Sequence, residues 1–216
     1  MDNRPFSSNW WNGNNYQGGR FNYAHYHNYD SGHWWKWATA GALTGWVAGA
    51  AWSQPNYYSY GSGGNVYYDN DVVYVDGQQY ASADEYYEEA ASIADSLPQV
   101  SDAQAEQIEW MSLGVFALTK EGVNDANMLL QLSVSQEGYI AGTFYNTATD
   151  TTRSIEGAID EQSQRVAMGF ADGQNPDVIL ECGVFNLTED ESEALVHHGA
   201  DQVQYVVLVR LDDPQE

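Results

Sequence analysis

The chain has 216 residues, enough for one ordinary domain with additions or for two small domains. It carries 31 acidic and 7 basic residues, a net charge of -24. Nucleic acid and anionic membrane surfaces are therefore poor partners, because both are bound through clustered Lys and Arg. A single cysteine, Cys182, excludes an internal disulfide and a multi-cysteine metal site.

Charge and aromatic residues are unevenly distributed along the chain. Residues 61–109 hold eleven acids and no base, whereas residues 1–60 hold two acids and three bases. Seven of the eight tryptophans lie before residue 53. These shifts in composition indicate at least three regions.

Residues 1–33 are rich in Asn, Gly, Tyr, His and Trp and contain almost no aliphatic side chain. Aromatic residues without aliphatic neighbours rarely build a core, so this segment is predicted to be disordered and of low complexity. It lacks the basic stretch and the apolar run of a signal peptide.

Residues 34–52 are apolar and predict a helix with tryptophan at both ends. Gly41, Gly45 and Gly49 recur every four residues, so on one helix they form a candidate association face. The charge-free part covers roughly 24 Å as a helix, less than the roughly 30 Å of a hydrocarbon core. Three interpretations stay open: a packing or self-associating helix, a short or interfacial membrane segment, and a relic of a signal peptide.

Residues 53–64 are predicted to be a linker, and residues 65–97 a β-hairpin followed by a helix. The hairpin signal is the acidic turn at 69–71 between aromatic and β-branched runs, closed by a second turn at residues 76–77. Ser82 and Glu85 form a capping-box pattern at the helix start, and Pro98 ends the helix. Residues 98–109 are predicted to be another polar linker.

From residue 110 onward the hydrophobic pattern alternates with a period of two. Short strands separated by tight turns indicate a mainly β fold, and residues 110–216 are predicted to form an eight-stranded antiparallel up-and-down barrel. The expected strands lie near 111–118, 127–135, 138–146, 152–159, 164–171, 177–186, 193–198 and 203–211.

The alternation also predicts which side chains fill the barrel. A small eight-stranded barrel either fills with side chains or leaves room for one ligand. Cys182 lies on a predicted core face, which indicates packing rather than a reactive thiol. The side chains expected to point inward are Leu130, Leu132, Ile140, Phe144, Met168, Phe170, Leu180, Val184, Tyr205 and Val207.

No pattern of catalytic, cofactor-binding or metal-ligating residues is present, so none is predicted and no cofactor is expected. His197 and His198 are neighbours on a strand and point to opposite faces, so they do not chelate one ion together. Glu88 and Glu89 are adjacent on a helix, where neighbours do not face each other. We interpret them as a solvated face.

Most of the chain resembles a family of planctomycete-type bacterial cell-surface proteins labelled mu-protocadherin-like. The resemblance lies in Asn3-Arg4-Pro5, the Trp/Gly segment 34–52, residues 65–77, the run 110–118 and residues 138–146. It implies export, with a signal peptide upstream, and a location outside the cell or in the cell envelope. It supplies no catalytic residue.

A second resemblance concerns the barrel alone. Residues 138–144 and the eight-strand order resemble avidin-like barrels of the calycin type, which bind biotin among several tryptophans. Only Trp110 lies in this region, so no binding residue is carried over.

Three classes of function follow from these observations. The favoured one is a non-enzymatic structural or interaction protein of the envelope, which self-associates or binds envelope components, with membrane contact through residues 34–52. The alternative is a barrel that binds a small apolar ligand. An enzyme has the least support.

Overall fold

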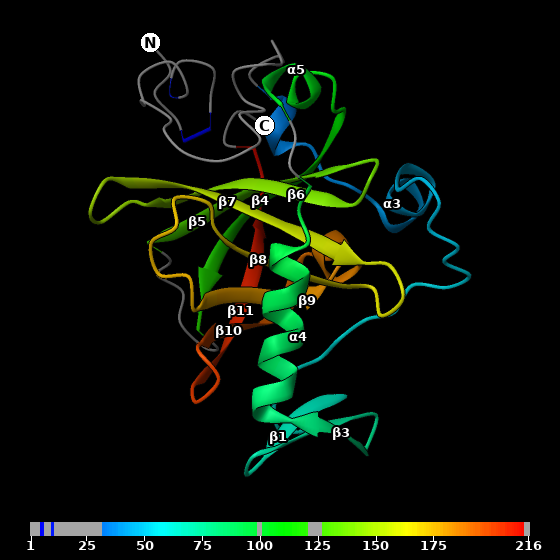
Figure 1. Cartoon of the computed structure of the whole chain (residues 1–216). Coiled ribbons are helices and arrows are strands. Elements are labelled where there is room, and N and C mark those ends of the chain that lie inside the picture. Colours follow the sequence, from blue (N-terminus) through cyan, green and yellow to red (C-terminus); the bar gives the residue numbers. More distant parts are fainter. Residues whose placement is uncertain (1–4, 7–9, 11–31, 99–100, 121–126, 214–216) are drawn as a thin grey trace.

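The computed structural model describes residues 5–6, 10, 32–98, 101–120 and 127–213 (Figure 1). A closed β-barrel forms its centre, a three-stranded sheet lies at one end, and helices cover the outside of the barrel. The predicted mainly β class and the eight-stranded antiparallel barrel are confirmed.

The barrel is a simple meander in which each strand pairs antiparallel with the next, and the last strand closes on the first. Most strand ends match the prediction to within one or two residues. One strand stops at Gly183 rather than 186, because a 3-10 turn, η2 (Asn186–Thr188), follows it. The strands are β4 (Trp110–Thr119), β5 (Met128–Ser135), β6 (Tyr139–Asn146), β7 (Thr151–Asp160), β8 (Arg165–Phe170), β9 (Val178–Gly183), β10 (Glu191–His198) and β11 (Val203–Leu211).

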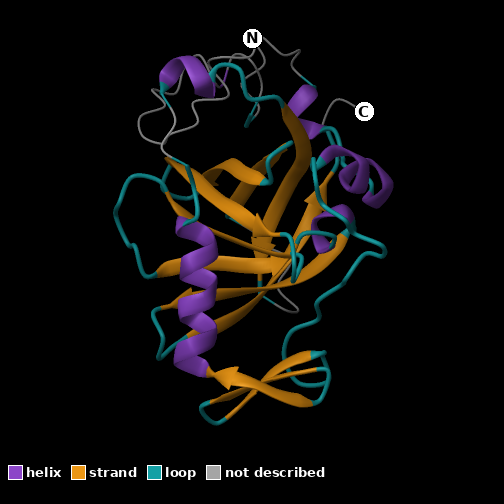
Figure 2. Cartoon of the chain, turned by 45° about the vertical axis from the view of Figure 1, so that its right-hand side comes forward, coloured by secondary structure: helices purple, strands orange, loops and turns teal. Residues whose placement is uncertain are grey.

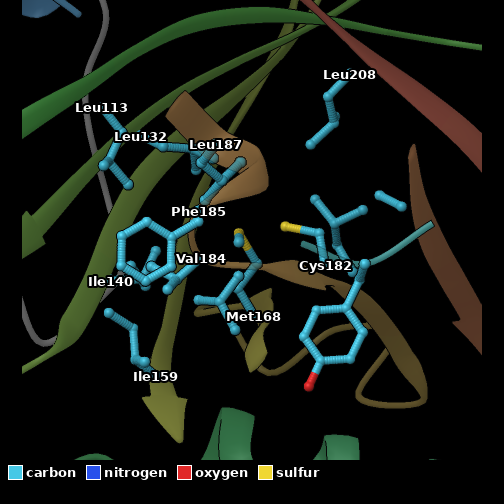
Figure 3. Close-up of a cluster of buried hydrophobic side chains, with 14 of the residues drawn as sticks. Leu113, Leu132, Ile140, Ile159, Met168, Cys182, Val184, Phe185, Leu187 and Leu208 are labelled. Atoms are coloured by element: carbon cyan, nitrogen blue, oxygen red, sulfur yellow. The ribbon is translucent and has the colours of Figure 1, made fainter. Parts of the chain in front are cut away.

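Bulky apolar side chains pack inside the barrel, as the alternation predicts (Figure 3). Phe185 and Leu187, in and beside η2, add to this core from one end. Cys182 is fully buried in the same cluster, and burial raises the pKa of its thiol, so it packs as a small apolar group. Ten of the side chains are labelled in Figure 3: Leu113, Leu132, Ile140, Ile159, Met168, Cys182, Val184, Phe185, Leu187 and Leu208.

The predicted inward face of β11 is wrong by one residue. Val206 and Leu208 lie in the core, whereas Tyr205 is 41% exposed and Val207 is only half-buried. The reason is that both faces of β11 are apolar, so alternation alone does not choose between them, and a one-residue slip reverses the faces. The other eight predicted inward residues belong to the core or pack against it.

Arg210 closes the end of the barrel near η2. Its guanidinium donates hydrogen bonds to the main-chain carbonyls of Leu113, Leu187 and Glu189. Gly114 makes room for it: its φ is +119°, and a Cβ there would lie 2.5 Å from Arg210 Nη1. A side chain at this position would therefore displace the arginine.

The predicted hairpin is in fact a three-stranded sheet of β1 (Val66–Asp69), β2 (Val72–Val75) and β3 (Gln78–Ser82). Asp76 and Gly77, both with positive φ, make the tight turn between β2 and β3. The sequence pattern missed β3 because Gln78 and Gln79 are polar and exposed.

Helix α4 (Ala83–Asp95) begins where the sequence predicts, because Ser82 and Glu85 form the reciprocal capping box. It runs from the small sheet along the outside of the barrel (Figures 1 and 2) and contacts β7, β8 and β9. Ala90 and Ala94 are buried against Ala167 and Ile179 on the barrel's outer surface. The small alanines let the helix approach the sheet closely.

The predicted helix over residues 34–52 is wrong in its extent. A 3-10 turn, η1 (His33–Trp35), is followed by extended chain, and only α3 (Ala40–Trp46) is helical, capped by Thr39. The tertiary contacts explain the break: η1 packs on β4 and β5, and the Trp46 indole donates to the carbonyl of Val134.

The prediction of disorder for residues 1–33 falls mainly outside the described residues. Where it can be compared, it is wrong: Phe6 and Trp10 are buried, in a cluster with Trp34 and Trp35 on the outer surface of β4 to β6. These aromatic side chains have few aliphatic neighbours in the sequence. In the fold they pack against aliphatic side chains of the barrel, which include Val115 and Ala141.

The predicted linker at 53–64 is bound to the barrel by side-chain hydrogen bonds. We call residues 52–60 the strap. The Trp52 indole donates to the Glu161 carbonyl, and the Asn186 side chain bonds to both the N–H and the carbonyl of Tyr58. The second predicted linker, at 98–109, contains a short helix, α5 (Asp102–Ala105).

Candidate functional site

The most concentrated polar chemistry in the described residues lies on the outside of the barrel, beneath α4. Along β9, Leu180 and Cys182 point into the core, so Glu181 between them points outward. There it is covered by α4 and the strap and is fully buried. A buried carboxylate is costly unless it is paired and hydrogen-bonded.

Both carboxylate oxygens of Glu181 are engaged. Oε1 accepts from the hydroxyls of Tyr86 on α4, at 2.7 Å, and of Tyr60 on the strap, at 3.3 Å. Arg165 Nε on β8 donates to the same oxygen at 3.0 Å. Oε2 lies 2.9 Å from His197 Nε2 on β10. We call these five side chains the Glu181 network.

Arg165 extends the network toward solvent. Its Nη1 donates to Glu89 Oε2 at 2.8 Å, and the Tyr80 hydroxyl donates to the same oxygen at 3.0 Å. Its guanidinium also stacks 4.1 Å from the centre of the Tyr86 ring. Glu89 is therefore one partner of a buried arginine, which corrects the prediction that it belongs to a purely solvated face.

The protonation states follow from these contacts. Burial alone would raise the pKa of Glu181, but the charge of Arg165 and the hydrogen bond of His197 outweigh it and hold the pKa below its ordinary value. Burial and the Glu181 charge raise the pKa values of Tyr60 and Tyr86 well above the ordinary value. At neutral pH the centre is thus a carboxylate facing an arginine and two neutral tyrosines.

The network joins three parts of the fold through one carboxylate: barrel strands β8 to β10, helix α4 and the strap. Its acid, base and hydroxyl groups bond to one another and are shielded from solvent, except where Arg165 meets the partly exposed Glu89. A general acid or base must reach a substrate proton. This arrangement therefore holds the barrel strands, α4 and the strap together.

A groove of about 450 Å³ lies beside the network, between the strap and strands β10 and β11. Tyr60 links the two, because its hydroxyl binds Glu181 while its N–H donates to Glu193 Oε2 at 2.6 Å. Glu191, Glu193 and Tyr205 are exposed in the groove lining. No basic side chain lines it.

The three glycines of the candidate association face do not share one helix. Gly41 and Gly45 lie on α3, are exposed, and have open space where a side chain would project. Gly49 lies beyond the helix end, with a φ of +87°. The face is thus reduced to two glycines, and association through it stays a prediction.

His197 and His198 point to opposite faces of β10, as predicted. His197 is buried and bonded to Glu181, whereas His198 is exposed. Within the described ranges, no group of three or more His, Cys, Asp or Glu is placed to hold a metal ion.

Sequence reasoning missed the Glu181 network. Two signals were present: Glu181 interrupts an apolar strand between Leu180 and Cys182, and Arg165 is one of only seven basic residues. Neither signal indicates which residues bond to Glu181 or Arg165, because the hydrogen bonds of the network join residues up to 121 positions apart.

No protein-family model matches this chain, and neither a curated protein nor a solved structure is significantly similar to it. None of the described helices has the length and apolar character needed to cross a membrane.

Proposed function

We propose that this chain is a non-enzymatic structural or interaction protein of the cell envelope or the extracellular space, which works through the outer surface of its barrel. The proposal rests on one observation, which is how the buried acidic and basic side chains are used. In the Glu181 network, the buried side chains of Arg165 and His197 each bond to Glu181, and these bonds hold the elements of the fold together.

One further observation supports this proposal over a barrel that holds a ligand inside. Phe116, Phe185 and Met168 are almost fully buried in the core cluster, where an internal ligand would need space.

The location can be tested on intact cells of the source organism. An antibody raised against the folded protein should label intact cells, or detect the protein in the medium, without permeabilisation. Labelling that requires permeabilised cells would contradict the proposed location.

A further inference from the structure

The chain turns sharply between the strap and the small sheet, and we propose that this turn opens so that two copies of the protein exchange the segment before it. We call residues 32–60 the arm and residues 61–64 the hinge. The partner is a second copy of this chain, bound through the same contacts that hold the arm to its own barrel. This inference rests on the proposed function, because it names what binds to the outer surface of the barrel.

The hinge is a tight and crowded turn. Tyr60 and Val66 form a parallel bridge with only five residues between them, whereas parallel pairs ordinarily need a connection of a dozen or more residues. Gly61 has a φ of +97°, and a Cβ on Gly64 would collide with the carbonyl oxygen of Ser59. Short hinge loops under strain favour exchange between copies, because extending the loop releases the turn. Glycines in the hinge also regain conformational freedom when it opens.

The arm can move to a second copy without breaking the barrel. All eight barrel strands lie after the hinge. Within the arm, the Trp46 indole donates to the carbonyl of Val134, and the Asn186 side chain bonds to the N–H and carbonyl of Tyr58. A second copy offers the same groups, so an exchanged arm makes these contacts unchanged. Opening the hinge breaks the hydrogen bonds that join residues 57–61 to residues 64–66.

The distribution of charge favours contact through the arm over contact between two barrels. The arm carries one base, Lys36, and no acid, whereas 29 of the 31 acids follow residue 60. Two such acidic bodies repel each other, which disfavours a dimer in which the barrels face each other. The nearly uncharged arm can bind the acidic body of a second copy. Salt screens the remaining repulsion and should therefore raise the dimer fraction.

The test is size-exclusion chromatography with light scattering on the full chain, equilibrated over a wide range of protein concentration. We expect a dimer whose fraction rises with protein concentration and with salt. Inserting six Gly and Ser residues between Gly63 and Gly64 relaxes the closed turn and should lower the dimer fraction at least fivefold. Deleting Ser62 and Gly63 makes the loop too short for the closed turn and should give a dimer at every concentration.

Two controls separate arm exchange from other modes of association. The same insertion between Ala200 and Asp201, in the turn between β10 and β11, should leave the dimer fraction unchanged. Asn186→Ala removes a contact that the closed monomer and the exchanged dimer both make. It should therefore lower the stability of both forms and change the dimer fraction less than twofold.

Two outcomes would overturn the proposal. One is a natural chain that stays monomeric at every concentration, and the other is an equal dimer fraction in the natural chain and the lengthened hinge. The lengthened hinge keeps the test decisive if the shortened variant fails to fold. The cell-labelling experiment does not depend on oligomeric state, so failure of arm exchange and failure of the proposed function are distinguishable.

Discussion

At the scale of single residues, Glu181 is the most consequential side chain outside the barrel. Its carboxylate is fully buried and bonded to groups from β8, β10, α4 and the strap. Removing one partner of a buried ion pair is strongly destabilising, because the remaining charge stays buried without compensation.

Glu181→Gln should therefore lower the free energy of unfolding by about 3–5 kcal/mol, since Arg165 loses its buried carboxylate partner and keeps only the partly exposed Glu89. Urea unfolding followed by circular dichroism measures this difference. Glu88→Gln, at an exposed position of α4, serves as the control and should change stability by less than about 0.5 kcal/mol. Equal effects of the two substitutions would contradict the role assigned to Glu181.

The same carboxylate predicts an acid dependence. Because its pKa in the folded state lies below the ordinary value, its contribution to stability is fully present above the unfolded pKa of about 4.3. The contribution is lost as the pH falls through the folded pKa. The stability difference between the natural chain and Glu181→Gln should thus be constant near neutral pH and shrink in acid. A stability difference that grows on acidification would contradict a lowered pKa of Glu181 in the folded state.

At the scale of elements, the strap is one of the segments that hold the chain before the barrel against its outer surface. Gly183 lies where the strap crosses the end of β9. A Cβ there would collide with Asn186 Oδ1 and lie 2.7 Å from Tyr58 Cδ2. Gly183→Ala should therefore displace the strap and cost about 1–3 kcal/mol, in the range of overpacked sites.

Limited proteolysis at the strap, together with urea unfolding, checks this prediction. Gly169→Ala is the matched control: it lies on the neighbouring strand β8, and its Cβ would meet Ile179 at an ordinary 3.4 Å. Faster cleavage within residues 52–60 is expected only for Gly183→Ala. Identical cleavage rates would show that the strap is not held there.

The elements also differ in how well sequence predicts them. Helix α4 was predictable because Ser82, Glu85 and Pro98 are local signals that act within one turn of a helix end. The helical segment at 34–52 was not, since its tryptophans are placed by distant partners such as Ser112, whose hydroxyl bonds to the Trp34 carbonyl. Tertiary contacts override local preference there.

At the scale of the whole molecule, the barrel was predictable from alternation, and the candidate site was not. Eight short strands with tight turns favour closure, because closing the sheet removes its edges. The Glu181 network and the groove depend on how the preceding chain folds over the barrel, and no pattern in the sequence encodes which residues then meet. Glu193 and Tyr60, for example, are 133 positions apart.

The central claim at this scale is that the described residues before Trp110 and the barrel form one folded unit. Seven of the eight tryptophans lie before residue 53, so tryptophan fluorescence reports mainly on the covering segments, whereas far-ultraviolet circular dichroism reports mainly on the barrel strands. The most direct test follows both signals in one urea titration of the full chain. The account predicts a single transition with the same midpoint for both probes. A fluorescence transition at clearly lower urea than the loss of strand signal would contradict it, because the covering segments would then unfold from an intact barrel.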